Sequence, residues 1–174
     1  MLRNTGFTLV ELMVVLAVFA VLSAVAVPGL GRMAAEQRVI TSTNMLLSAL
    51  HLARSEAVRR NQRVTLCPST NGAQCTPGVG YDAGWIVFAG PAAGAGLGSG
   101  GEVIRQQAAM RQGLWATGNG SMAQYVSYLP SGQTRQLGGA LQMGRITICH
   151  EEIGRSIIIS RVGRPRVEET SCLT

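Results

Sequence analysis

The chain opens with a long hydrophobic stretch and then changes to shorter patterned runs. Residues 7–28 contain a single ionisable side chain, Glu11. An apolar run of this length is what a helix needs to cross the hydrocarbon core of a bilayer. The pattern predicts a transmembrane helix over residues 7–29, with the short basic leader of residues 1–6 on the cytoplasmic side.

A second helical pattern follows Pro28 and Gly29, where a proline kinks or loosens a helix without necessarily ending it. Apolar or small residues recur there at steps of three and four, the spacing of one helix face. These residues are Val39, Thr43, Leu46, Leu47, Leu50, Ala53 and Ala57. The pattern predicts that residues 30–62 form the second half of a stalk helix, packed by this face on a head.

The opposite face of that helix is charged. It carries Glu56 together with Arg54, Arg59, Arg60 and Arg63. Such a face is expected to be solvated, and an auxiliary contact with a polyanion is the alternative.

From residue 63 to 174 the chain has short β-type runs separated by Gly, Pro, Asn and Ser. The runs are RVTLC, WIVFA, EVIRQ, LWAT, QYVSYL, RITICH and RSIIISRV. Their connections are too short for helical crossovers, so antiparallel sheets are expected. The predicted fold class is α+β, with a long helix packed on a β-rich head. The glycine-rich segment 90–101 precedes a β-type run rather than a helix, which favours a flexible hairpin loop over a dinucleotide site.

All 15 basic residues are arginine, against 9 acidic residues, and the formal net charge is +6. Arginine binds phosphate in a bidentate way, so the surface is suited to polyanions. Four widely spaced cysteines behind a membrane anchor indicate two disulfides in an oxidising compartment, with buried free thiols as the alternative. Of three possible connectivities the most local one joins Cys67 to Cys75 and Cys149 to Cys172.

The strongest candidate for a binding element is the segment GRPR near the C-terminus. In an extended segment Arg164 and Arg166 project to one side about 6.6 Å apart, a spacing that serves neighbouring phosphates. Gly163 permits a turn, and Pro165 stiffens the segment. Three further arginines, Arg145, Arg155 and Arg161, complete the predicted DNA-binding set. The alternative is a structural hairpin in which Glu168 and Glu169 pair with these arginines.

Catalysis has little support in the sequence. The only histidines are His51, on the predicted helix, and His150, beside Cys149, and both are interpreted as satisfied structural residues. No metalloprotease, nucleophile-elbow or phosphate-loop motif is present. We therefore predict no enzymatic activity, no catalytic residue, no metal and no cofactor.

Glu11 is unusual because a carboxylate in a membrane span costs roughly 2.5 to 3.5 kcal/mol on insertion scales. Cleavage after Gly6 would create an α-amino group on Phe7, four residues from Glu11 and able to pair with it within or between subunits. The stretch GFTLVELMVVLAVFAVL resembles the class III prepilin signature of type IV pilins and type II secretion pseudopilins. The resemblance implies cleavage between Gly6 and Phe7 by a prepilin peptidase, N-methylation of Phe7, and a role for Glu11 in filament assembly with other pilin subunits. It also implies a single-pass inner-membrane protein with a periplasmic head, later incorporated into a pilus at the surface of a Gram-negative bacterium.

Three stretches of the predicted head are informative: GWIVFAG at 84–90, YVSYLPSGQT at 125–134 and RSIIISRVGRPR at 155–166. They resemble the FimT/GspH-like minor pilins. The resemblance implies that Gly163, Arg164 and Arg166 match a C-terminal G-R-x-R element that binds double-stranded DNA without sequence specificity during uptake for natural transformation. The alternative function is a structural minor pilin or secretion pseudopilin that primes or caps a filament without binding DNA.

Overall fold

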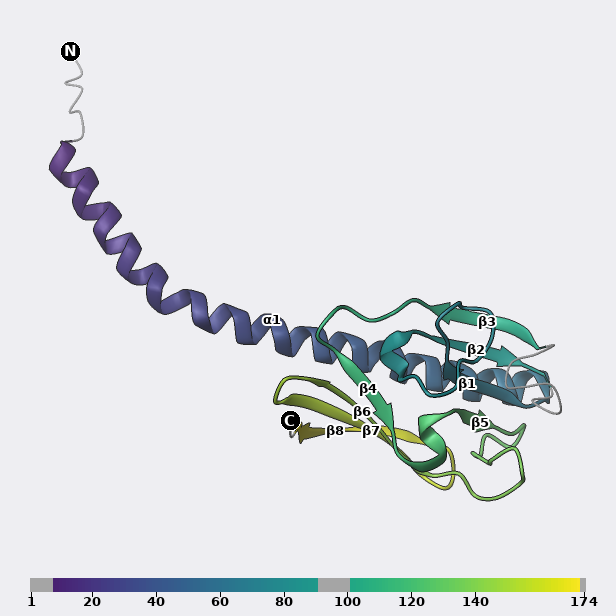
Figure 1. Ribbon diagram of the computed structural model, residues 1–174. Coiled ribbons are helices and arrows are strands. Elements are labelled where there is room, and N and C mark those ends of the chain that lie inside the picture. Colours follow the sequence, from purple (N-terminus) through teal and green to yellow (C-terminus); the bar gives the residue numbers. More distant parts are fainter. Residues whose placement is uncertain (1–7, 91–100, 173–174) are drawn as a thin grey trace, which may run out of the picture. The chain divides into compact units, whose positions relative to one another are not determined.

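A computed structural model describes residues 8–90 and 101–172, with backbone only over residues 24–30. It divides into two compact units, Met1–Glu36 and Gln37–Thr174, which are treated separately below. The second unit contains residues 37–60 of the long helix together with all eight strands (Figure 1). The last turns of the helix therefore belong to the head rather than to a separate stalk.

Helix α1 runs from Leu9 to Arg60 without interruption. At its start the Glu11 amide donates to the Thr8 hydroxyl at 3.3 Å, so Thr8 caps the helix and Glu11 occupies the third position of a capping-box spacing. At its end Asn61 adopts φ 49°, and the Gln62 amide donates to the Ala57 carbonyl at 3.3 Å. This is a Schellman-type ending, and it stops the helix two residues before the predicted boundary at 62.

In the first unit the apolar side chains from Leu9 to Leu22 are exposed, and Leu9 is 70% accessible. A search of the described residues finds no helix that is both long enough and apolar enough to span a bilayer. The predicted leader 1–6, with Gly6, lies outside the described residues. So do Phe7 and the side chains at the end of the predicted span.

The strands form two antiparallel sheets. The first has the order β3-β2-β1-β5, with β1 Val64–Pro68, β2 Trp85–Ala89, β3 Glu102–Gln107 and β5 Val126–Tyr128. The second has the order β4-β6-β7-β8, with β4 Trp115–Gly118, β6 Gly144–His150, β7 Ile153–Ile159 and β8 Pro165–Ser171. Short 3-10 turns at Tyr81–Ala83 and Gly120–Ala123 precede β2 and β5. The expected α+β class is confirmed.

All seven predicted β-type runs contain a strand, whereas β8 was not among them. Its sequence PRVEETS opens with proline and carries two glutamates, and it pairs only with β7 at the edge of the sheet. Edge strands tolerate proline and charge because one side of their backbone faces away from the sheet. β2 and β3 are antiparallel neighbours, so the glycine-rich segment joins a hairpin, although residues 91–100 lie outside the described residues.

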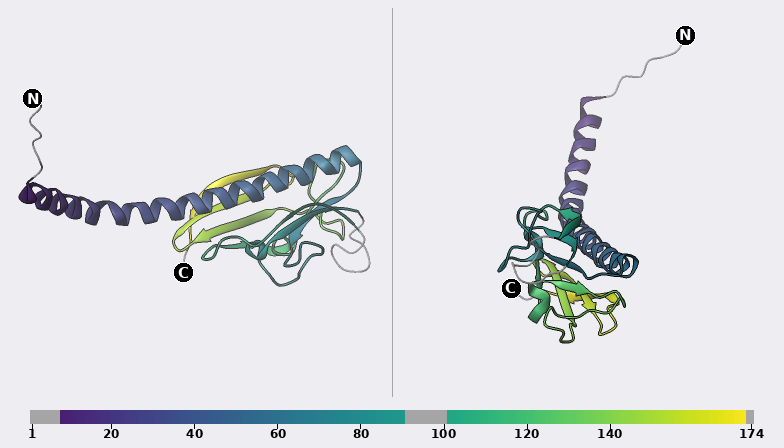
Figure 2. Two further views of the ribbon diagram at one scale, coloured as in Figure 1. Left: turned by 90° about the horizontal axis from the view of Figure 1, so that it is seen from above. Right: turned by 90° about the vertical axis from the view of Figure 1, so that its right-hand side faces the viewer.

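One hydrophobic core holds the helix and both sheets together. The predicted stripe on α1 is buried, with Leu47 partly buried and Ala49 added to it. It packs with residues of both sheets, among them Val87 and Ile157. Figure 2 shows the end of α1 running alongside the strands of the head. Burying a leucine or isoleucine side chain contributes roughly 1.5 to 3 kcal/mol, so this stripe anchors the helix segment to the head.

The charged face of α1 is less solvated than predicted. Glu56 is only 8% exposed and lies 2.6 Å from both Arg59 and Arg60. Arg60 also reaches Glu102 on β3 at 2.6 Å. Hydrogen bonds from Arg59, and to a smaller extent from Arg60, hold the pKa of Glu56 below its ordinary value. The hydrogen bond from Arg60 likewise lowers the pKa of Glu102. These charges tie the end of the helix to the first sheet.

Arg63 is half-buried against the head rather than fully solvated. Its guanidinium donates to the Ser127 hydroxyl at 2.9 Å and to the Arg135 carbonyl at 3.2 Å. Arg63 therefore braces the segment after β5.

Both disulfides follow the local connectivity. Cys67 is joined to Cys75 and Cys149 to Cys172, with Cα separations of 5.6 and 6.1 Å. The second bridge ties the end of β8 to β6, across β7. It therefore holds the hairpin that carries the GRPR segment.

Candidate nucleic-acid interface

The GRPR segment comprises the end of the turn between β7 and β8 and the first two residues of β8. The Gly163 amide donates to the Ser160 carbonyl at 2.8 Å, and the Ser160 amide donates to the Arg164 carbonyl at 3.2 Å. Gly163 has φ +74°, the left-handed conformation that closes a three-residue hairpin loop. The glycine predicted to permit a turn does so.

This turn packs closely on another part of the head. A Cβ added to Gly163 would collide with the Gly132 carbonyl oxygen and would lie 3.1 Å from the Tyr128 ring. Arg54 of α1 donates to the Val162 carbonyl at 3.4 Å. The hairpin loop is therefore held against both the 129–133 turn and the helix.

The arginines on this turn remain accessible. Arg161 and Arg164 are exposed, and the side chain of Arg166 is 69% accessible. Alternation along the strand puts Arg164 and Arg166 on one side, with their Cα atoms about 6.6 Å apart. The loop fixes the backbone that carries these side chains while leaving their guanidinium groups in solvent.

Strand register adds Arg145 to this side. Ile158 of β7 lies between Arg145 of β6 and Arg166 of β8 in the pairing. Two strand spacings separate the two arginines, about 9.6 Å. Arg145 is exposed, so it extends the basic surface across the sheet.

Arg155 does not join this surface. It pairs in register with the buried Ile148 and lies three residues from Ile158 in β7, so it faces the other side of the sheet. Its side chain is 24% accessible and lies 3.1 Å from Glu169. The sequence grouped it with the other arginines because proximity along the chain does not reveal the side of the sheet.

One carboxylate faces the basic side. Glu168 lies 2.9 Å from Arg166, in a pair whose side chains are 50% and 69% accessible. Exposed pairs of this kind contribute only about 0 to 1 kcal/mol, so a phosphate can compete for the arginine. No ion pair between described residues involves Arg145, Arg161 or Arg164.

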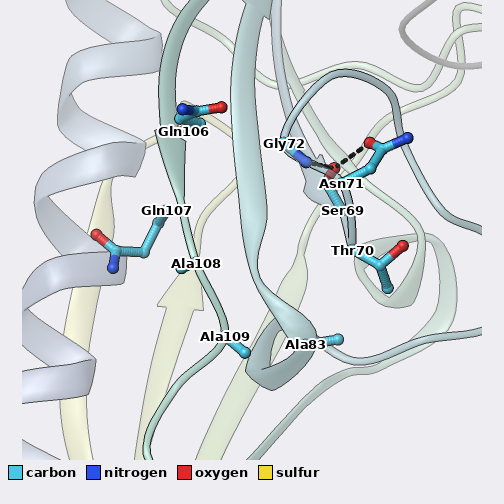
Figure 3. Close-up of a pocket in the computed structure, with 9 residues that line it drawn as sticks. All are labelled: Ser69, Thr70, Asn71, Gly72, Ala83, Gln106, Gln107, Ala108 and Ala109. Atoms are coloured by element: carbon cyan, nitrogen blue, oxygen red, sulfur yellow. Dashed lines mark hydrogen bonds between the residues drawn. The ribbon is translucent and has the colours of Figure 1, made fainter.

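The head also has a polar pocket of about 410 Å³ beside the Cys67–Cys75 loop (Figure 3). Its lining consists of neutral side chains and glycine backbone: Ser69, Thr70, Asn71, Gly72, Ala83, Gln106, Gln107, Ala108 and Ala109. The Ser69 hydroxyl accepts from the Gly72 amide at 3.0 Å and lies 2.7 Å from the Gln74 carbonyl. Because that hydroxyl is used in holding the loop and no lining residue is a base, the pocket lacks the groups for acid–base catalysis.

The two histidines belong to α1 and β6. His51 is exposed on α1, and His150 has a buried Nδ1 with no hydrogen-bond partner among the described residues, so the interpretation of His150 as fully satisfied was wrong. Within residues 8–90 and 101–172 no group of three His, Cys, Asp or Glu side chains is placed to hold a metal ion.

Comparison with known protein families shows to which family this chain belongs. A family model described as "Type II transport protein GspH" matches residues 42–163, which cover most of the head. The chain belongs to the GspH family. A second model, the prokaryotic N-terminal methylation motif, matches residues 1–27. A search of curated proteins gives no match.

Solved structures with the same fold include a minor pilin and a pseudopilin. The type IV minor pilin FimU of Pseudomonas aeruginosa has a TM-score of 0.59 at 19% identity, covering 76% of this chain and 89% of FimU. The minor pseudopilin EpsH of Vibrio cholerae type 2 secretion has a TM-score of 0.51 at 13% identity, covering 76% of this chain and 97% of EpsH. These likenesses show that this GspH-family chain shares the fold of both proteins.

Sequence reasoning missed the residues that support the GspH-family hairpin. Arg54 was treated as part of a solvated face, and Gly132 and Tyr128 as part of a family-like stretch. Each contacts or hydrogen-bonds the 160–164 turn. The available signal was the pair of glycines in LPSGQ and RVGRP, but glycine alone does not reveal which turns meet.

Proposed function

We propose that this protein is a minor type IV pilin that binds double-stranded DNA without sequence specificity through the β7–β8 turn and so supports DNA uptake in natural transformation. The observation that carries the proposal is the accessibility of Arg161 and Arg164 on the 160–164 loop, which packs tightly at Gly163, and of Arg166 at the start of β8. A held loop loses less conformational entropy on binding than a mobile one.

The chemistry of this surface fits the phosphate backbone. Guanidinium groups contact phosphates in a bidentate way, and contacts to phosphate position a protein without reading base edges. Three or four such contacts give weak binding that falls steeply with salt, because each contact releases condensed counterions. Several subunits along one filament would raise the avidity without any new contact.

We propose further that the N-terminal segment is processed and assembled as in other pilins. A prepilin peptidase would cut between Gly6 and Phe7 and Phe7 would be N-methylated. The match to the methylation motif over residues 1–27 supports this, as do the exposed apolar side chains of α1 from Leu9 onward. The chain would then sit in the inner membrane with a periplasmic head before it joins other pilin subunits in a surface pilus of a Gram-negative bacterium.

Glu11 has two roles in this scheme. Before cleavage it lies at the third position of the capped first turn of α1, where a carboxylate is favoured. After cleavage the proposed role is to pair with an α-amino group of Phe7 and set the register between subunits.

The second candidate function is a structural minor pilin or secretion pseudopilin that primes or caps a filament without binding DNA. The observations that favour it are the ion pairs of Arg166 with Glu168 and of Arg155 with Glu169, which satisfy two of the five arginines in the predicted DNA-binding set.

A gel shift with duplex DNA of mixed sequence separates the two functions. The full chain in a neutral detergent is compared with the double variant Arg164→Gln/Arg166→Gln. The matched control is Arg111→Gln, an exposed arginine on the segment between β3 and β4. We expect loss of the shift only in the double variant, with circular dichroism unchanged. A shift that persists in the double variant would exclude the turn as the DNA site.

A further inference from the structure

A second basic surface lies beside the hairpin. An open groove of about 800 Å³ is formed by one face of α1 and by β3. Its lining includes His51, Arg54, Ser55, Val58, Arg59 and Arg105. Val58 is 54% exposed, and the side chain of Arg59 is 69% accessible, so the groove is open to a large ligand.

The groove has an excess of positive charge. No ion pair between described residues involves Arg54 or Arg105, and Arg59 pairs with Glu56. The Arg105 guanidinium lies 5.8 Å from the centroid of the Trp85 ring, which orients it without neutralising it. The sequence of residues 91–100, which leads into β3, contains no acidic residue. Two uncompensated arginines therefore face the groove.

Arg54 connects the groove to the hairpin. It lines the groove, and it donates to the Val162 carbonyl in the β7–β8 turn at 3.4 Å. That acceptor is a neutral carbonyl, so the charge of Arg54 stays available. From His51 to Arg59 the groove follows about 12 Å of helix, roughly twice the 6.6 Å spacing that serves neighbouring phosphates.

We propose that this groove is a second contact for the DNA backbone, continuous with the β7–β8 turn through Arg54. The inference rests on the proposed function, since it extends the path of the same ligand. The chemistry recognised is a run of phosphates, with Arg54 and Arg105 as the groups that contact them. One subunit then covers a longer stretch of DNA than the turn alone, which raises affinity and salt dependence together.

The test measures binding of a labelled duplex of mixed sequence to the full chain in a neutral detergent, by fluorescence anisotropy between 50 and 200 mM salt. Each lost phosphate contact reduces the slope of log K against log salt by about 0.9. In the variant Arg54→Gln/Arg105→Gln the magnitude of that slope is therefore expected to be smaller than in the wild type by about 1.8. Its affinity in the lowest salt is expected to fall by at least ten-fold, roughly. The control Arg111→Gln removes the same kind of charge outside the groove and is expected to keep the wild-type slope.

Two further variants separate contact from hairpin support. Arg105→Gln leaves the hydrogen bond between Arg54 and Val162 untouched, and we expect it to lose about 0.9 of the slope. Arg54→Lys keeps the charge but loses the planar fork, and we expect the wild-type slope. A weaker affinity with an unchanged slope in Arg105→Gln would overturn the proposal, because a phosphate contact must release counterions.

The outcomes distinguish this inference from the proposed function. If the wild-type chain does not bind DNA, the proposed function fails and this inference fails with it. If Arg164→Gln/Arg166→Gln loses binding while both groove variants match Arg111→Gln, the proposed function stands and the groove has another occupant, such as a neighbouring subunit. Loss of binding in Arg164→Gln/Arg166→Gln together with reduced slopes in both groove variants supports a continuous path.

Discussion

The contact between the β7–β8 turn and the rest of the head gives a sharp prediction, because the chain contains a matched control. The segments 160–164 and 136–140 share one hydrogen-bond pattern: the first residue donates to the fifth, and the glycine at the fourth position donates back to the first. Gly163 has φ +74° and Gly139 has φ +87°. Their surroundings differ, since nothing lies within 4 Å of a Cβ added at Gly139.

Replacing Gly139 by alanine therefore costs only the left-handed backbone, about 1 to 2 kcal/mol. Replacing Gly163 by alanine costs the same amount and also forces the 160–164 turn away from the Gly132 carbonyl. That second contribution resembles overpacking of a core and is about 1 to 3 kcal/mol. The expected free energy of unfolding is thus lower in Gly163→Ala than in Gly139→Ala by about 1 to 3 kcal/mol.

Urea unfolding of the full chain in a neutral detergent measures this difference. Trp85 is fully buried, so its fluorescence reports on the head. With a slope of about 2 kcal/mol per molar urea, the Gly163→Ala midpoint is expected about 0.5 to 1.5 M below that of Gly139→Ala. Equal midpoints would refute the reasoning, since they would mean that the two turns do not press on each other.

Three further predictions follow from the same structure. Replacing Cys149 and Cys172 together by alanine opens a bridge with a sequence separation of 23 and is expected to lower the free energy of unfolding by about 3.4 kcal/mol, measured in urea. Because the arginine contacts of Glu56 and Glu102 depress the pKa of both carboxyls, their contribution is present above the ordinary value of 4.5 and is lost as pH falls through the lower folded-state value. Glu102→Gln is thus expected to flatten the fall of the thermal midpoint on acidification below pH 4.5, and an unchanged profile would contradict this assignment. Glu168→Gln removes the ion-pair partner of Arg166 and is expected to tighten DNA binding in the anisotropy assay. If the hairpin is purely structural, the DNA affinity is expected to stay unchanged.

Two observations link the fold to the proposed role. The arginine-bearing turn lies at the end of a hairpin that the Cys149–Cys172 bridge ties to the middle of its sheet. Arg54 holds the same turn from the helix side. Weak, salt-sensitive binding by each subunit would suit a filament that must capture DNA and then release it.

Much of the architecture follows from the sequence alone. Steps of three and four from Val39 to Ala57 predicted the buried helix face, because a helix brings such positions to one side. β-type residues between turn formers predicted seven of the eight strands. The order of the cysteines along the chain favoured the most local disulfides, and Gly163 predicted the turn. All of these features are set by residues that lie close to one another along the chain, so the sequence alone is enough to predict them.

The tertiary structure decided which residues meet. Arg155 and Arg166 lie close in the sequence, but strand register puts them on opposite sides of one sheet. The sequence predicted that Glu56 is solvated. In the fold Glu56 pairs with Arg60, and Arg60 also pairs with Glu102 of β3. The strand β8 escaped prediction because an edge position tolerates the proline and glutamates that its sequence contains. The contact of Gly163 with Gly132, and of Arg54 with Val162, joins segments far apart in the chain, and only packing of the whole head selects such partners.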